Sequence, residues 1–378
     1  MNILELLKKI THKTIPPLLL TYVLYKILAV GTINYPCKNP ILLNTNTEDY
    51  SKSKINYDYD IIKLTNGICH YRTNIIKGSS ELYDLNDTYV FIHGNDGSLY
   101  DFNNIIKELY YHNSLLKEDC DKDTSKYFKP IRYIVYDLYG RGYSQYDNSP
   151  QTLQLFISQL SELLYALNIH HKVHLVGYEM GSAIVTGFAS VYPDKIKSII
   201  LLSPIGYKSY RDIIRPWWYK YIYGNEIFMT LLSVYNNKLY TKEIEDYDKE
   251  WNNTDSPIFE AYINNREKYY SNIEYNMDIK MNTIYNWKSY INNFPVGELD
   301  DTYKNINHTI DNIYVLLPEC DKYNPINKAS IIFKTLNKCD KMLLKDYKSS
   351  FHIEHGHNVF NIINDWVSKC DNNSIIIQ

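Results

Sequence analysis

The stretch from residue 173 to residue 181, Val-His-Leu-Val-Gly-Tyr-Glu-Met-Gly, constrains the fold of this chain more than any other. Its apolar first half is typical of a buried strand, and residues 182–192 have the composition of a helix. Gly177 and Gly181 bracket the junction. Such glycines are expected in a turn so sharp that a side chain would collide with the neighbouring strand and helix. The sequence therefore predicts a strand, a strained turn and a helix, with Glu179 at the turn.

Short apolar runs recur along the chain and alternate with amphipathic segments. We expect strands at 61–64, 68–73, 89–92, 131–136, 173–176, 199–202, 313–317 and 341–344. Strands that are apolar on both faces need helices on both sides of the sheet. The predicted fold class is therefore α/β, with a mostly parallel sheet covered by helices on both faces.

Four further motifs accompany these strands. His93-Gly94-Asn95 follows the strand at 89–92, and Asp137-Leu-Tyr-Gly-Arg-Gly-Tyr-Ser144 follows the strand at 131–136. Pro318-Glu-Cys-Asp321 follows a later strand, and Glu354-His-Gly-His357 precedes a helix predicted at 358–369. Together with the glycine-flanked turn, these motifs resemble the α/β-hydrolase superfamily, especially its lipase, esterase and epoxide-hydrolase-like members. The resemblance implies the α/β-hydrolase fold with an inserted helical cap.

The resemblance also implies an active site. It assigns Glu179 to the nucleophile position of the elbow, Asp321 to the acid position and His357 to the general base. The backbone N–H groups of Asn95 and Met180 are expected to form the oxyanion hole.

A glutamate at the elbow excludes the ordinary serine-esterase mechanism. Serine attacks a carbonyl because a histidine takes its hydroxyl proton, whereas Glu179 has no such proton to give. Ser182 cannot replace it, since it lies inside the helix. At the helix N-terminus the carboxylate anion is favoured, and a Glu179 side chain that folds back would occupy the oxyanion hole and pair with His357. For Arg141 we expect a structural role, bracing its own loop.

Two classes of function remain open. One is a catalytically silent or repurposed hydrolase homologue, which binds or scaffolds. The other is an active hydrolase of a lipid, ester, epoxide or haloalkane in which the elbow carboxylate attacks carbon. The extra methylene of Glu179 relative to aspartate disfavours the second class, because a displacement of about a bond length costs on the order of 100-fold in rate. If the remaining frame is intact, Glu179→Ser is expected to restore ester hydrolysis and His357→Ala to abolish it.

The chain divides into core blocks at 61–204 and 313–378, separated by residues 205–312. The intervening stretch lacks strong strand signals, and we assign it to the helical cap. Residues 36–60 are polar and rich in turn-forming residues, and we interpret them as a linker.

Residues 1–35 are a candidate membrane anchor or signal segment. The apolar run at 15–33 follows Lys8, Lys9 and Lys13, as expected for an anchor with a cytosolic N-terminus. Lys26 interrupts the run and leaves it shorter than the roughly 20 residues that a span needs. An amphipathic helix that packs on the domain is the alternative.

The composition of the chain limits the classes of partner and ligand that we expect. The chain is 45% hydrophobic and 22% charged, which allows a sizeable core, and its net charge of −3 gives no indication of a nucleic-acid partner. The six cysteines lack C-x-x-C spacing, which argues against a zinc site. We expect no cofactor and no metal, a small apolar ligand or lipid under the cap, and membrane association through residues 15–33.

Overall fold

The computed structural model describes residues 59–75, 87–95, 97–118, 130–145, 151–204, 251–270, 298–321 and 332–376. All of them belong to one compact unit, which comprises Cys37–Ile213 and Glu243–Gln378. The membrane candidate at 15–33, nearly all of the expected linker and most of the expected cap lie outside the described residues. Within the described part of the chain, no helix is long and apolar enough to cross a membrane.

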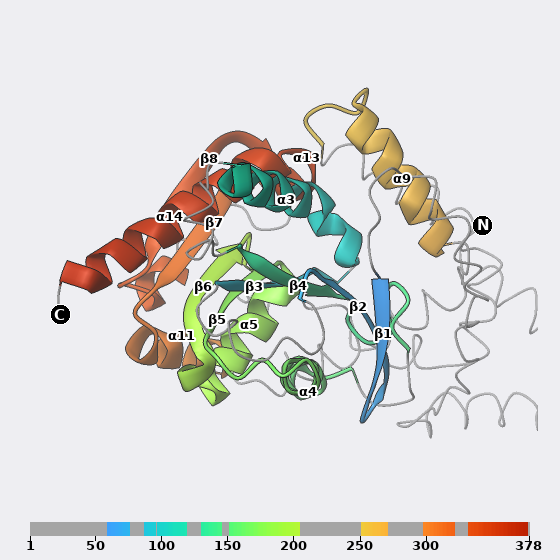
Figure 1. Ribbon diagram of the computed structural model, residues 1–378. Coiled ribbons are helices and arrows are strands. Elements are labelled where there is room, and N and C mark those ends of the chain that lie inside the picture. The colour runs from blue at the N-terminus through green and yellow to red at the C-terminus, as the bar shows by residue number, and fades with distance from the viewer. Residues whose placement is uncertain are drawn as a thin grey trace, which may run out of the picture. The chain divides into compact units, whose positions relative to one another are not determined.

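The centre of this unit is an eight-stranded sheet in the order β1-β2-β4-β3-β5-β6-β7-β8 (Figure 1). The strands are β1 (Tyr59–Leu64), β2 (Gly67–Thr73), β3 (Thr88–Ile92), β4 (Arg132–Tyr136), β5 (Val173–Tyr178), β6 (Ile196–Leu202), β7 (Ile313–Cys320) and β8 (Asp340–Lys348). Strand β2 is antiparallel to both neighbours, and every other pair is parallel. All eight expected strands are present, and the predicted fold class is confirmed.

Helices cover both faces of the sheet (Figure 1). One face packs against η1 (Leu99–Phe102), α3 (Asn103–Glu118), α13 (Phe351–Glu354) and α14 (Gly356–Ile376). The other packs against α4 (Leu153–Ala166), α5 (Met180–Val191) and α11 (Glu298–Thr309). The short η3 (Pro193–Lys195) leads into β6, and α9 (Pro257–Tyr270) follows a segment that contacts β8.

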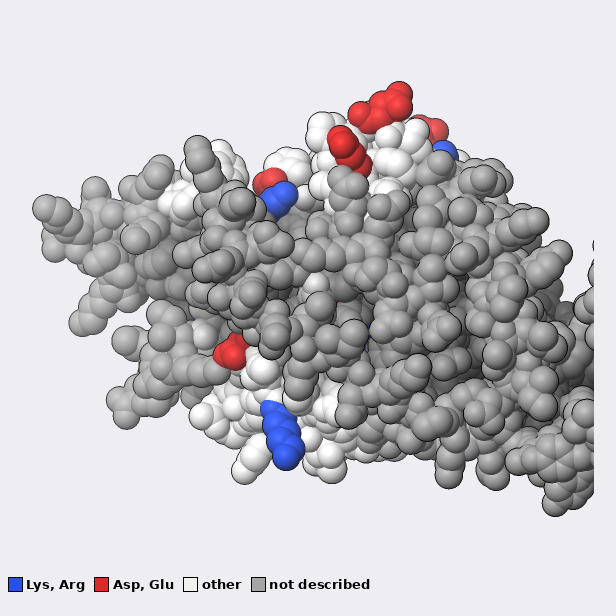
Figure 2. Space-filling view, turned by 90° about the vertical axis from the view of Figure 1, so that its right-hand side faces the viewer, with Lys and Arg blue, Asp and Glu red and all other residues white. Residues whose placement is uncertain are grey.

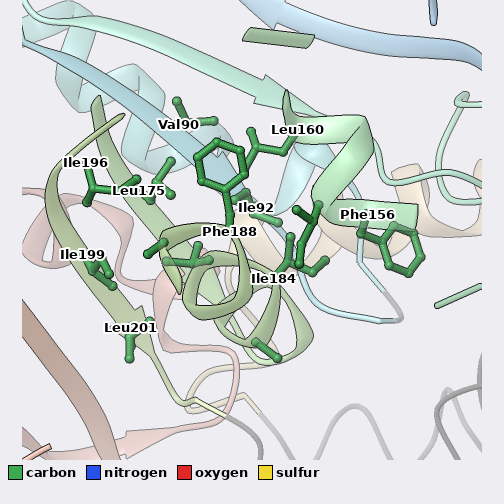
Figure 3. Close-up of a cluster of buried hydrophobic side chains, with 14 of the residues drawn as sticks. Val90, Ile92, Phe156, Leu160, Leu175, Ile184, Phe188, Ile196, Ile199 and Leu201 are labelled. Atoms are coloured by element: carbon green, nitrogen blue, oxygen red, sulfur yellow. The ribbon is translucent and has the colours of Figure 1, made fainter. Parts of the chain in front are cut away.

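Alternation along the strands builds a separate apolar core on each face. In β3, Val90 and Ile92 belong to the cluster under α4 and α5, whereas Tyr89 and Phe91 belong to the cluster under α3 and α14. Figure 3 shows the first cluster, in which Phe156, Leu160, Ile184 and Phe188 from the helices meet Leu175, Ile199 and Leu201 from the strands. Each such side chain contributes about 1.5–3 kcal/mol on burial, so the core fixes the sheet edge that carries the site.

Two expected boundaries need correction. Strand β1 begins two residues before Ile61, because Tyr59 and Asp60 continue the ladder with β2. Helix α11 lies within the range assigned to the cap, yet its Tyr303 and Ile306 are buried in the core beside α5, so residues 298–312 belong to the core. The cap assignment for the stretch before α11 stays a prediction.

The charged side chains of the described surface are dispersed. Figure 2 shows acidic side chains at the upper edge of the face that it presents, with basic side chains beside some of them, and one acidic and one basic side chain lower down among uncharged residues. The described residues of this face therefore form no extended patch of one sign.

Candidate active site

The predicted sharp turn is present between β5 and α5. Glu179 has φ 49° and ψ −111°, a strained conformation for a residue with a side chain, and α5 begins at the next residue, Met180. A Cβ on Gly177 would lie 2.5 Å from the carbonyl oxygen of Gly181, and a Cβ on Gly181 would lie 2.1 Å from that of Ile92. The two glycines are therefore required by backbone contacts, as the sequence predicts.

The carboxylate of Glu179 lies against the loop that follows β3. The backbone N–H of Asn95 donates a hydrogen bond to Glu179 Oε2 at 3.3 Å. A Cβ on Gly94 would lie only 2.6 Å from the same oxygen, so the approach depends on glycine at position 94. The backbone N–H of Asn95, the expected oxyanion donor, thus donates to the side chain of the elbow residue itself. The role of Met180 as second donor stays a prediction.

Arg141 holds the loop that presents this N–H group. Its guanidinium donates to the side-chain Oδ1 of Asn95 at 2.7 Å and to the backbone oxygen of Asn95 at 3.3 Å. It also donates to Gln151 at 2.6 Å and to the carbonyl of Tyr139 at 2.9 Å. The expected structural role of Arg141 is therefore confirmed, and it extends to the neighbouring loop as well as its own.

Asp137, which sequence reasoning did not single out, organises the same region. The buried carboxylate accepts the backbone N–H groups of Leu99 and Tyr143 at 2.8 and 3.0 Å and lies 2.7 Å from His70 Nδ1. A Cβ on Gly142 would lie 2.1 Å from it, which explains a glycine of the Asp-x-x-Gly-Arg-Gly motif. The Asp-x-x-Gly-Arg-Gly motif could therefore have identified Asp137 from the sequence.

The second carboxylate of the site, Asp321, directly follows β7 as expected. Its partners include two hydroxyl groups. Ser203 Oγ donates a short hydrogen bond to Asp321 Oδ2, and Ser349 Oγ donates to Oδ1 at 3.1 Å. Ser203 follows β6 and Ser349 follows β8, so three neighbouring strands deliver these groups to one edge of the sheet. Neither serine was predicted from the sequence.

The comparisons with known proteins agree with this geometry. The family model described as alpha/beta hydrolase fold matches residues 89–257, from β3 through the elbow. The chain therefore has the α/β-hydrolase fold and is similar to that family over these residues. No curated protein matches it in sequence.

Solved structures of α/β hydrolases show the same fold at low identity. The 2-hydroxy-6-oxo-6-phenylhexa-2,4-dienoate hydrolase of Rhodococcus sp. strain RHA1 is 15% identical with a TM-score of 0.59, and the match covers 82% of this chain and 99% of that one. A thermophilic esterase from Thermogutta terrifontis is 17% identical with a TM-score of 0.55, over 82% and 98%. The naproxen esterase of Bacillus subtilis is 15% identical with a TM-score of 0.53, over 85% and 95%.

The structure corrects the expected position of the α/β-hydrolase histidine. His357 lies on α14, where its Nδ1 is 2.7 Å from Glu108 Oε2 of α3 and its side chain is 61% exposed. Its other hydrogen bond is to Asn361 on its own helix. The expected convergence of His357 with Glu179 and Asp321 is therefore not observed.

The strand that precedes this part of the chain, β8, is also longer than expected. The sequence predicts that this strand ends at Leu344, but it continues to Lys348. Of the added residues, Lys345 and Asp346 are exposed and Tyr347 and Lys348 are half-buried at the edge strand of the sheet, so they form no apolar run. The residue that directly follows the strand is Ser349, and Ser349 contacts Asp321.

The other two histidines after β8 do not contact Asp321 either. His355 lies beside Tyr347 and Glu354. His352 is fully buried, its ring centroid is 3.8 Å from that of Tyr178, and neither of its ring nitrogens has a hydrogen-bond partner. Burial lowers the pKa of His352 to about 3, so it stays neutral in the folded chain at neutral pH.

Proposed function

We propose that this α/β-hydrolase-fold protein is a catalytically silent or repurposed homologue of the serine hydrolases. One observation carries the proposal: the Glu179 carboxylate accepts the N–H group of Asn95. That donor would otherwise stabilise the negative oxygen that forms when an ester carbonyl is attacked. The elbow residue therefore blocks one oxyanion donor and lacks the hydroxyl that would attack.

The surroundings of Asp321 support the same proposal. In a working triad the acid orients a histidine, which takes and returns the proton of the nucleophile. Here Asp321 accepts hydrogen bonds from the hydroxyls of Ser203 and Ser349, which cannot act as a base near neutral pH. None of the three histidines that follow β8 contacts it.

A carboxylate nucleophile would use the site differently. An oxygen of Glu179 would attack a saturated carbon of an epoxide or haloalkane, the carbon–oxygen or carbon–halogen bond would break, and an ester of Glu179 would form. Water would then have to hydrolyse that ester with the help of a base. The arrangement around Asp321 supplies no histidine from the segment after β8 for this second step, so we favour the silent site over this alternative.

The proposal retains a small apolar ligand or lipid as the occupant of the site, and membrane association through residues 15–33. These expectations rest on the sequence alone. Most of the assigned cap and the apolar N-terminal run, on which they depend, lie outside the described residues.

The experiment compares the purified unmodified protein with Glu179→Gln, which is closest in shape and has no anionic oxygen. We expect neither protein to hydrolyse p-nitrophenyl acetate or butyrate, and neither to react with a fluorophosphonate probe. Intact-mass and peptide spectra after incubation with styrene oxide or 1-bromohexane should show no adduct on Glu179. Turnover of any of these substrates that is lost in Glu179→Gln would overturn the proposal and establish a carboxylate-nucleophile hydrolase.

A further inference from the structure

The three residues Trp251, Asn252 and Asn253, here called the strap, contact the end of β8 and the short helix α13. They are separated from these partners by more than ninety residues in sequence, as the contact of Asn252 with Asp346 across 94 positions illustrates. The contacts fall at both ends of the segment from Lys348 to Glu354. This segment follows the last strand, where the family resemblance predicts the histidine-bearing loop, and its own His352 is buried away from Asp321.

At the first end, Asn252 pairs with the outer edge of β8. Its side-chain amide donates a short hydrogen bond to the carbonyl of Asp346 and accepts the N–H of Lys348 at 3.1 Å. One side chain thus satisfies one backbone acceptor and one backbone donor at the end of β8. The ammonium group of Lys348 adds a hydrogen bond of 2.5 Å to the carbonyl of Trp251.

At the second end, the Glu354 carboxylate accepts two successive backbone N–H groups. Oε2 accepts from Asn252 at 2.8 Å and Oε1 accepts from Asn253 at 2.7 Å. Trp251 anchors the strap in the core. Its side chain is 1% exposed, and its ring centroid lies 5.0 Å from that of Phe259 of α9. Charge-assisted hydrogen bonds of this kind are stronger than neutral ones.

The residues between the two ends contact the elbow and the acid. Ser349 donates its hydroxyl hydrogen to Asp321, and its carbonyl accepts the hydroxyl of Tyr178 at 3.0 Å. His352 packs its ring on Tyr178, the residue before Glu179. A shift of this segment would therefore change which side chain lies beside Asp321.

We propose that the strap is a conformational lock, which holds the segment after β8 in the arrangement that keeps Ser349 against Asp321 and His352 buried. The proposal rests on the proposed function only for the meaning of this arrangement, in which no histidine of the segment contacts Asp321. The hydrogen bonds at its two ends determine the position of the segment, and Glu354 and Asn252 provide most of them.

Hydrogen exchange followed by mass spectrometry tests the lock in the full chain. Asn252→Ala removes the two side-chain bonds to β8, and Glu354→Ala removes both bonds to the strap. In each variant, peptides that cover residues 346–354 should exchange about tenfold faster or more, because hydrogen bonds to strand edges and charged groups limit local opening. Glu162→Ala is the matched control. It removes a carboxylate that accepts the N–H of Thr65 at 2.7 Å in the turn between β1 and β2, and it should leave residues 346–354 unchanged.

The exposed position of Asn252 makes Asn252→Ala the deciding variant if Glu354→Ala does not fold. Unchanged exchange of residues 346–354 in Asn252→Ala would overturn the lock, as would equal acceleration in Glu162→Ala. The two proposals fail separately. Ester hydrolysis by the unmodified protein would contradict the proposed function and leave the lock intact, whereas unchanged exchange would contradict the lock alone.

Discussion

At the scale of single residues, the account depends on where the Glu179 side chain points. Its backbone has the strained turn that the elbow requires, and its carboxylate reaches the N–H of Asn95. Gly94 permits this approach because it has no Cβ. The glycine and the glutamate are therefore coupled, and the coupling can be measured.

We predict that Gly94→Ala destabilises the chain through a clash with Glu179. The new Cβ would lie 2.6 Å from Glu179 Oε2 and 3.1 Å from Tyr178 Cδ1, and overpacking of this kind costs about 1–3 kcal/mol. In a Glu179→Ala background the first contact disappears and the cost should fall. Urea unfolding of the four proteins in this cycle gives the coupling free energy. An equal cost in both backgrounds would show that the carboxylate does not lie beside Gly94.

At the scale of elements, the sheet was predictable and one loop was not. Apolar runs located all eight strands, and two glycines located the elbow, because burial and backbone contact leave a direct mark on the sequence. Asn95 and Asp321 were found because each lies in a segment after a buried strand, at the place that the family resemblance assigns to it. The prediction of the site failed after β8, whose last residues form no apolar run because the strand lies at the edge of the sheet. The expected histidine, His357, was chosen because it matches the family's Gly-His motif, and it lies on the surface between α3 and α14.

The hydroxyl partners of Asp321 could not have been predicted either. Ser203 and Ser349 lie 146 positions apart in the sequence (349 − 203), and only the order of β6, β7 and β8 in the sheet brings them together. The same holds for Glu354 and Asn252, which meet across 102 positions. Long-range polar contacts of this kind have no local sequence pattern.

At the scale of the whole molecule, two buried histidines contribute to the loss of stability in acid. Burial lowers the pKa of His352 to about 3 and that of His93 to about 4, against about 6.5 in an unfolded chain. Below pH 6.5 the unfolded chain therefore binds protons that the folded chain does not. The free energy of unfolding should fall as the pH drops from 6.5, by at most about 1.4 kcal/mol per pH unit for each histidine.

We predict that His352→Phe reduces this slope between pH 6.5 and pH 5. A phenyl ring can make the same contacts with Tyr178, Phe102 and Phe351 and has no nitrogen to protonate. The variant should also gain stability at pH 7, because two unpaired buried nitrogens disappear. Urea unfolding at several pH values measures both effects. The same slope in the variant as in the unmodified protein would mean that His352 is not buried in a neutral form.

The rate at which a fluorophosphonate labels Glu179→Ser tests the central claim most directly. The variant restores a hydroxyl at the elbow and frees the N–H of Asn95, but none of the three histidines that follow β8 contacts Asp321. We predict that Glu179→Ser labels no faster than a surface serine, since loss of the histidine from a working triad costs on the order of 10⁶ in turnover. Rapid labelling of Ser at position 179 would show that a base lies beside the elbow, and it would contradict the account of a site without a catalytic histidine.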